Sequence, residues 1–426
     1  MSSLINSKIA SSFAIGYIFS NNSINISQKF NNIDDAILFI DGKLELERQI
    51  KKRIDQNYIN FAKQIILTIN GPFVFLIVKN KTQIIGRDIL GIQPFYFGQT
   101  KKYFAFASNR QILWNFNIIY PEFFPPGKIC IPSTSNLKFL QVKKFTRPST
   151  ISINKENAAK KLFELLSMSM KNNLNKIDKC AIAFSGGLDS VLVSFLAKQY
   201  LQNVQLIHVS LSNNPEIEIA KEVAQILDLP INIYEYEKSD VQETVYKVLK
   251  IIEDPDPIKV SIGIPFFWIA EKAKKLGYNT LLAGQGADEL FGGYRRYLEN
   301  YLSNNKEQVA KQMFDDIINM HENNLARDMK LCNYHGIELL CPFLTNELIE
   351  FALKLPVELK IGKNINSSRK LVLRQVALNV GLPPLIVNKS KKAIQYSTGV
   401  NNILKKIAKK NKKSLSKYIR SIFLKQ

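Results

Sequence analysis

The sequence has few cysteines and histidines, the residues that form disulfides and bind zinc. Its 426 residues include four cysteines and three histidines, and no two cysteines form a CxxC pair. Scattered cysteines without paired spacing are typical of buried thiols in a reducing compartment, which argues against a disulfide framework. Three widely spaced histidines argue equally against a zinc site built from His and Cys ligands.

Long apolar runs are also missing. A helix needs about 20 apolar residues to cross a bilayer, and the longest candidate, "IILTINGPFVFLIV", is interrupted by Asn70, Gly71 and Pro72. The first residues, "MSSLINSKIASSFAIGYIFS", carry a lone Lys8 and lack the layout of a signal peptide, because their apolar part is typical of a first strand. We therefore expect a soluble, cytoplasmic protein.

Acidic residues are scarce relative to basic ones. The formal charge is +22, and clustered basic residues can neutralise nucleic-acid phosphates. However, the lysines accompany heavy isoleucine and asparagine usage, and the last 38 residues alone hold 12 basic and no acidic residues. Apolar residues at helical spacing in this tail predict a basic amphipathic helix docked on its own domain. Binding of the tail to RNA, an acidic partner or an anionic membrane surface is the alternative.

The residues that are present follow two different patterns. A chain of this length favours two domains, and Pro-, Gly- and Ser-rich sequence marks their junction. Short apolar runs bounded by turn residues predict an α+β domain over 1–125. After a linker over 126–155, strand-like and helix-like segments alternate within 156–426. This alternation predicts an α/β domain with a doubly wound parallel sheet, mostly helical from residue 300 onward.

One loop of this sheet, "FSGGLDS", is suited to binding an anion. Gly186 and Gly187 let successive N–H groups point at one anion, Ser185 and Ser190 add hydroxyl groups, and the next helix adds its positive N-terminus. Asp189 would repel a phosphate unless a divalent cation lay between them, which predicts Mg²⁺. The loop lacks the lysine of a Walker motif, so it suits a pyrophosphate group rather than transfer of a terminal phosphoryl group.

A second loop, "LLAGQGADELFGGY", repeats this logic. Gly284 and Gly286 let the backbone approach a ligand, and Asp288 is a second carboxylate after a predicted strand. Ligands of such sheets bind beyond the carboxyl ends of the strands. Asp189 and Asp288 are therefore the expected metal ligands, holding Mg²⁺ on a nucleoside triphosphate.

These motifs resemble those of the asparagine synthetase family, a branch of the PP-loop ATP pyrophosphatase superfamily. Besides the two loops, "GIELLCPFLTNELIEFALKLPVELKI" and "SSRKLVLRQVALNVGLPPLIVNKSKKAIQYSTGV" are similar to later family segments. Upstream, "NGPFVFLIVKNKTQIIGRDILGIQPFYFG" and "FPPGKICI" resemble the family's glutaminase domain and its junction. The resemblance implies an N-terminal glutaminase-like (Ntn-type) sandwich and a C-terminal sheet of the PP-loop, adenine nucleotide alpha-hydrolase type.

The resemblance also implies a reaction. In this family ATP adenylates a carboxylate, pyrophosphate leaves, and an amine attacks the acyl-adenylate to give an amide and AMP. The implied catalytic residues are Asp288, Gln285 and a lysine of "KSKKAIQYS", Lys392 or else Lys391. The implied nucleotide-binding residues are Phe184, Ser185, Gly186, Gly187, Leu188, Asp189, Ser190, Val209, Gly284 and Gly286.

Other positions match the family less closely. Arg295 and Arg296 are either substrate contacts or surface pairs, and Glu253 with Ser261 loosely matches a stretch near the family's acceptor pocket. The family's "GEGADE" glutamate is Gln285 here, and a neutral amide cannot act as a base at pH 7.

The N-terminal domain departs from the family as well. The family's glutaminase uses a cysteine that becomes residue one, with its free amino group as base, whereas this chain begins "MSSL", with Ser2 at that place. The family's "NGE" corresponds to Ile40, Asp41 and Gly42, and its "GSD" loop is missing. We therefore predict a degenerate glutaminase-like fold without glutaminase activity.

The sequence as a whole predicts an ATP-dependent amide ligase of the asparagine synthetase type. It would use ATP and Mg²⁺, aspartate or a similar carboxylate, and free ammonia, with a homodimer as one option. Three alternatives stay open: an acyl-adenylate-forming enzyme with another substrate pair, including ring closure; a tRNA-modifying PP-loop enzyme, which the basic tail favours; and a non-catalytic binding protein of the same fold.

Overall fold

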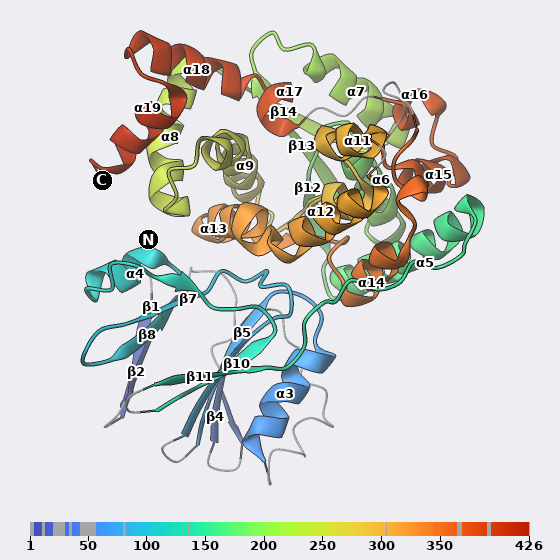
Figure 1. Cartoon of the computed structure of the whole chain (residues 1–426). Helices are drawn as coiled ribbons and strands as arrows, with labels where there is room; N and C mark the ends of the chain where they lie inside the picture. Colours follow the sequence, from blue (N-terminus) through green and yellow to red (C-terminus); the bar gives the residue numbers. More distant parts are fainter. Residues whose placement is uncertain are drawn as a thin grey trace. The chain divides into compact units, whose positions relative to one another are not determined.

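The chain divides into two compact units, Met1–Phe145 and Thr146–Gln426 (Figure 1). The computed structural model describes residues 4–10, 13–19, 30–33, 36–42, 57–79, 82–133, 136–303, 305–363, 369–389 and 393–425. Ser2, Lys391 and Lys392 therefore lie outside the described residues. Among those described, no helix combines the length and the apolar character that crossing a membrane requires.

The first unit contains a six-stranded antiparallel sheet in the order β11-β10-β6-β5-β4-β3. Helix α3 (Tyr58–Thr68) buries Phe61, Ala62, Ile65 and Ile66 in the core cluster that it shares with the sheet, as the helical spacing of these residues requires. The strands are β3 (Phe30–Ile33), β4 (Ala36–Gly42), β5 (Phe73–Lys79), β6 (Thr82–Arg87), β10 (Lys128–Pro132) and β11 (Leu137–Gln141).

The smaller elements of this unit complete an α+β fold, as its short apolar runs predict. Two further antiparallel sheets have the orders β1-β2 and β8-β7-β9. Their strands, with one short helix, are β1 (Leu4–Ala10), β2 (Phe13–Phe19), β7 (Tyr96–Gln99), β8 (Phe104–Ala107), β9 (Glu122–Phe123) and α4 (Arg110–Asn115).

The segment expected as a linker, 126–155, differs from that expectation. Its first half forms β10 and β11, and β10 pairs with β6, so the six-stranded sheet extends into it. The Pro- and Gly-rich composition marks the turns around these strands and does not show their pairing with a strand distant in sequence. The two units divide between Phe145 and Thr146.

The "GRDILGIQP" motif of this unit is a buried turn. The carboxylate of Asp88 accepts hydrogen bonds from the backbone N–H groups of Leu90, Ile92 and Gln93, at 2.8–3.1 Å. The Arg87 guanidinium beside it donates to three backbone carbonyls. Both side chains are buried, so these hydrogen bonds stabilise the turn.

The second unit contains a five-stranded sheet in the order β14-β13-β12-β15-β16, and every neighbouring pair is parallel. The chain adds β13 and β14 on one side of β12 and then crosses to place β15 on the other side. The strand order therefore reverses between β12 and β15. The strands are β12 (Lys179–Ala183), β13 (Asn203–Leu211), β14 (Ile231–Tyr236), β15 (Thr280–Leu282) and β16 (Glu338–Leu340).

Helices cover both faces of this sheet, which confirms the doubly wound α/β prediction. Figure 1 shows α6 on one side of β12 and β13 and α9 on the other, and each contacts these strands. The helices between the strands are α6 (Leu188–Tyr200), α7 (Glu216–Leu227), α8 (Lys238–Ile252) and α9 (Pro257–Lys275), preceded by α5 (Lys155–Leu174).

Beyond β15 the unit is mostly helical, as predicted from residue 300 onward. A π-helical turn, His321–Leu325, leads directly into α13 (Ala326–Tyr334). The other elements are α10 (Ala287–Phe291), α11 (Arg295–Leu302), α12 (Lys306–Ile318), α14 (Asn346–Lys354), a 3₁₀ turn (Val357–Leu359), α15 (Leu371–Asn379), α16 (Pro384–Val387) and α17 (Ile394–Ser397).

The basic tail forms two helices rather than one. Helices α18 (Val400–Lys410) and α19 (Leu415–Phe423) both pack on α8 and α9. The break comes where the Ser414 side chain accepts a hydrogen bond from the Lys417 N–H and so caps α19. The apolar residues of the tail face the domain, and its lysines lie largely on the exposed side.

Candidate functional site

The two predicted loops meet at the point where the strand order reverses. Residues 184–187 follow β12, and residues 283–286 follow β15, the neighbouring parallel strand. A Cβ on Gly284 would lie 2.8 Å from the Cβ of Asp189, so glycine is required for this close approach. Sheets of this kind bind ligands in the crevice outside such a reversal.

The first loop carries the hydroxyl and N–H groups expected of an anion site. The Ser185 and Ser190 hydroxyl oxygens lie 3.3 Å apart, and Ser185 also accepts a hydrogen bond from the Gly187 N–H, at 3.3 Å. Ser185 is exposed, and Gly186 has a left-handed φ of 65°. Helix α6 begins directly after Gly187, so its first-turn N–H groups lie at the loop.

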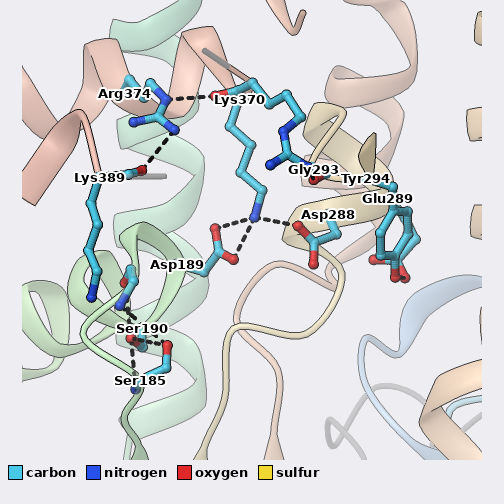
Figure 2. Close-up of polar contacts among 12 residues, drawn as sticks. Ser185, Asp189, Ser190, Asp288, Glu289, Gly293, Tyr294, Lys370, Arg374 and Lys389 are labelled. Atoms are coloured by element: carbon cyan, nitrogen blue, oxygen red, sulfur yellow. Dashed lines mark hydrogen bonds and ion pairs between the residues drawn. The ribbon is translucent and has the colours of Figure 1, made fainter. Parts of the chain in front are cut away.

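One ammonium group joins the two loops. Figure 2 shows the Lys370 side chain extending between Asp189 and Asp288. Its Nζ lies 2.6 and 2.5 Å from the two carboxylate oxygens of Asp189 and 2.6 Å from Oδ1 of Asp288. Lys370 is only 3% exposed. Burial lowers the pKa of Lys370, and the Asp189 carboxylate opposes that shift.

The second glycine of "FGGY" makes room for this cluster. A Cβ on Gly293 would lie 1.8 Å from Oδ1 of Asp288 and 2.4 Å from Cε of Lys370. The carbonyl of Gly293 accepts a hydrogen bond from the Arg369 side chain at 2.6 Å. Arg369 directly precedes Lys370, so this bond helps to hold the Lys370 backbone in place. The glycine that the sequence places here is therefore part of the site.

The donor set fits a magnesium ion bound together with a nucleotide. In nucleotide sites Mg²⁺ is held by one or two carboxylates together with substrate phosphates. Asp189 and Asp288 converge on one cation, which is Lys370 in this structure. Over the described ranges there is no cluster of three or more Asp, Glu, His or Cys residues that could hold a metal alone. Oxygen atoms of the nucleotide would have to complete the coordination shell.

Lys389, a lysine near the first loop, shortly precedes Lys391 and Lys392, the two alternatives for the predicted catalytic lysine. Lys391 and Lys392 are outside the described residues, but Lys389 places its Nζ 3.7 Å from the position of a Cβ on Gly186. Its Nζ is 3.4 Å from Oε2 of Glu216. Arg374 donates to the carbonyl of Val387 and, at 3.3 Å, to that of Lys389, and so anchors this segment. Figure 2 shows the contact with Lys389.

The remaining predicted nucleotide residues are buried around the loops. Phe184 and Val209, at the carboxyl ends of β12 and β13, are 3% and 2% exposed, and Leu188 is also buried. The Phe184 carbonyl lies 3.0 Å from Nδ1 of His208. Burial lowers the pKa of His208, which favours the neutral ring.

Gln285 contacts a buried carboxylate on α13. Its Nε2 donates a hydrogen bond to the carboxylate of Asp328. Arg327 holds the same carboxylate with Nε at 2.7 Å and Nη2 at 2.9 Å. Asp328 is 0% and Arg327 5% exposed. The sequence does not predict a role for Arg327 and Asp328, because they belong to no recognisable motif and are two polar residues of a buried helix.

The carboxylates of Glu253 and Glu289 both have protein partners. Glu253 forms a buried ion pair with Lys330 at 2.6 Å, and Ser261 donates to the carbonyl of Ile258. Glu289 accepts hydrogen bonds from the Tyr294 hydroxyl at 2.5 Å (both side chains appear in Figure 2) and from Asn324 at 2.7 Å. Burial raises the pKa of Glu289.

Arg295 and Arg296, left open between substrate contact and surface pair, form surface ion pairs. Arg295 lies 2.8 Å from Glu299, and Arg296 lies 2.7 Å from Asp316. Their side chains are 80% and 49% exposed, respectively. Neither contributes to the cluster that joins the two loops.

Comparison with protein families matches both units of the chain. The family model described as asparagine synthase matches residues 161–313 and 299–425, and the model of a glutamine amidotransferase domain matches residues 54–127. The first match alone covers more than half of the chain, so the resemblance stated from the motifs is confirmed.

The names of proteins similar in sequence to this chain are consistent with these two family models. "Putative asparagine synthetase 1 (glutamine-hydrolyzing)" of Methanocaldococcus jannaschii is 31% identical over 84% of this chain and 75% of its own length. The glutamine-hydrolyzing asparagine synthetase of Sandersonia aurantiaca is 26% identical over 80% of this chain and 67% of its own. Among solved structures, the NH3-dependent NAD synthetase of Campylobacter jejuni covers 42% of this chain at 16% identity, with a TM-score of 0.25.

Proposed function

This chain belongs to the asparagine synthetase family, and we propose that it adenylates the carboxylate of aspartate or a similar acid and then amidates it with ammonia. The supporting observation is the convergence of Asp189 and Asp288 on one cation beside the anion loop, at the point where the strand order reverses. Such an arrangement suits a nucleotide whose pyrophosphate leaves.

The roles proposed for the residues of the two loops and for the nearby lysines follow from their chemistry. The Ser185 and Ser190 hydroxyl groups and the N–H groups around Gly186 and Gly187 donate hydrogen bonds to the pyrophosphate. Asp189 and Asp288 hold the magnesium ion, which when bound neutralises charge on the leaving pyrophosphate. Lys392, or Lys391, is proposed to stabilise negative charge on the transferring α-phosphate, and Lys389 adds a positive charge near Gly186.

Ammonia rather than glutamine is the proposed nitrogen source. The family's glutamine-holding "NGE" corresponds to Ile40, Asp41 and Gly42, so Ile40 stands in place of its asparagine. The Asp41 carboxylate accepts a hydrogen bond from Gln93 at 3.0 Å. None of Ile40, Asp41 and Gly42 has a side-chain N–H with which to hold the amide oxygen of a glutamine. We propose that the first unit keeps the glutaminase-like fold without its reaction.

A second candidate is the same adenylation with another amine as acceptor. The observation that favours it is Gln285, which stands where the family's motif has glutamate and which cannot take up a proton from the amine. The activating half of the reaction is the same in both candidates.

Pyrophosphate release from Mg·ATP tests the proposal. Aspartate and other carboxylic acids would each be assayed with ammonium, with glutamine and with neither, and amide formation measured alongside. The proposal predicts release and amide formation with aspartate and ammonium, and none with glutamine. Release with a different acid or amine only would favour the second candidate. Absence of release with every acid would refute the adenylation itself.

Matched variants make this assay specific to the site. Asp189→Asn should abolish release, because the metal loses a ligand and Lys370 loses its closest partner. Asp228→Asn is the control, since Asp228 also pairs with a lysine, at 2.8 Å, but on an exposed surface remote from the loops in the fold. Equal rates for the two variants would contradict the assignment of Asp189.

A further inference from the structure

The contact between Gln285 and Asp328 fixes how the Gln285 amide is turned. An ionised carboxylate only accepts hydrogen bonds, so the amide must present its NH₂ group to Asp328. The Arg327 guanidinium binds both oxygens of Asp328 and so favours the ionised form of that carboxylate. Burial raises the pKa of Asp328, and Arg327 opposes that shift.

The orientation leaves the Gln285 carbonyl oxygen for a ligand. Asp328 is completely buried, whereas Gln285 keeps partial exposure in the loop after β15. With its NH₂ group held on the buried side, the amide directs its only acceptor atom away from Asp328. Gly284, the residue before it, approaches Asp189 of the first loop closely and so places Gln285 where the two loops meet.

A glutamate at this position would be incompatible with its neighbour. Replacing Gln285 Nε2 by a carboxylate oxygen would put two carboxylates in direct contact inside the protein. Like charges at that distance cannot both ionise, and one of the two pKa values rises strongly. The thiols of Cys332 and Cys341 also interact with Asp328, and they carry no positive charge. Glutamine at position 285 and aspartate at position 328 therefore form a matched pair.

We propose that Asp328 is a positioning residue, which holds Gln285 so that its carbonyl oxygen accepts a hydrogen bond from the amine that attacks the acyl-adenylate. This inference rests on the proposed function and assigns the amine subsite of that reaction. The new C–N bond forms as the C–O bond to AMP breaks, and its electron pair leaves with AMP. The proton that the amine loses passes to the departing AMP or to water, because an amide accepts a hydrogen bond but not a proton.

A reciprocal exchange tests the pairing. The variants are Gln285→Glu, Asp328→Asn and the two together, and each is assayed for adenylation by pyrophosphate release and for amide formation across pH at a fixed concentration of free ammonia. We expect Gln285→Glu alone to keep adenylation while amide formation near pH 7 falls about tenfold, with a new ionisation in its pH profile. The double variant should recover most of that loss, because the amide introduced at position 328 can donate a hydrogen bond to the carboxylate introduced at position 285.

Two further variants guard against a loss of folding. Gln285→Met keeps the volume of a half-buried side chain without its carbonyl, and it should raise the KM for ammonia about tenfold without a change in adenylation. Asp316→Asn is the control for loss of a carboxylate paired with an arginine, because Asp316 pairs with Arg296 outside the site. It should leave the KM for ammonia unchanged.

The outcomes separate the inference from the function on which it rests. Adenylation together with recovery in the double variant supports the pairing. Adenylation without recovery, or an unchanged KM for ammonia in Gln285→Met, overturns the inference while the proposed function stands. Failure of the wild type to release pyrophosphate with any acid overturns the proposed function, and the inference with it.

Discussion

Replacement of Lys370 by methionine should destabilise the second unit more than the loss of an ordinary ion pair. The Lys370 ammonium is buried and makes three contacts of 2.5–2.6 Å with Asp189 and Asp288. The two carboxylates are themselves only 21% and 19% exposed. Removing the ammonium therefore leaves two partly buried negative charges facing each other without the positive charge that lay between them.

The size of the effect follows from this geometry. Breaking a buried pair by removing one partner costs about 3–5 kcal/mol, because the remaining charge stays buried. The matched control is Lys259→Met, whose ammonium contacts one carboxylate, Asp254, at 2.7 Å with both side chains more than a fifth exposed. More exposed pairs contribute about 0–1 kcal/mol. The difference between the two variants should thus be about 3 kcal/mol.

Thermal unfolding without Mg²⁺ measures the loss of stability, and unfolding with Mg²⁺ measures whether the two carboxylates can bind a cation. In EDTA, Lys370→Met should lower the Tm by about 10 °C relative to Lys259→Met. Adding Mg²⁺ should then raise the Tm of Lys370→Met by more than that of the wild type, because the ion can bind between the vacated carboxylates. Equal Tm values for the two lysine variants, or no larger response to Mg²⁺, would refute the reasoning.

Three other perturbations test separate parts of the structure. Gly293→Ala should cost about 1–3 kcal/mol in urea unfolding, since its Cβ would overlap Oδ1 of Asp288, and an unchanged midpoint would contradict the packing. Arg296→Ala should change the KM for ATP and for the acid by less than about twofold, because Arg296 is half exposed and pairs with Asp316 outside the cluster that joins the two loops; a tenfold rise would assign it to substrate. Burial lowers the pKa of His335 to about 4 from 6.5. The unfolded chain then binds more protons between these values, so stability falls as the pH drops from 6.5 toward 4. His335→Gln should reduce that acid sensitivity, and an identical pH dependence of the Tm would argue against it.

The local motifs predict the second unit well because they report on neighbouring residues. Glycines and hydroxyl groups after an apolar run indicate a turn between a strand and a helix, and the alternation of strands and helices indicates a parallel sheet. From these two facts alone, Asp189 and Asp288 are expected at one edge of the sheet. The structure brings them together on Lys370.

The residues that complete the site come from distant segments and give no local signal. Lys370 lies 181 positions beyond Asp189 in the chain, and Asp328 lies 43 positions beyond Gln285. Lys370 occurs in "SSRKLVLR", a segment of the family resemblance, so that resemblance was the one signal that could have identified it. Asp328 is an isolated acidic residue in a helix, and only its contacts show its role.

The same limit explains the difference at the expected linker. Turn residues between 120 and 155 are visible in the composition, whereas the pairing of Ile129 and Cys130 with β6 depends on residues more than 40 positions earlier in the chain. A strand with such a partner cannot be recognised from its own sequence alone.

The transfer of an oxygen label tests adenylation most directly. Aspartate with ¹⁸O in its side-chain carboxylate would be incubated with the protein, Mg·ATP and ammonium, and the nucleotide product analysed by mass spectrometry. If the carboxylate attacks the α-phosphate, AMP carries one ¹⁸O atom and unlabelled pyrophosphate is released. Label in inorganic phosphate together with ADP would show attack at the γ-phosphate, and it would contradict the function proposed for the two loops.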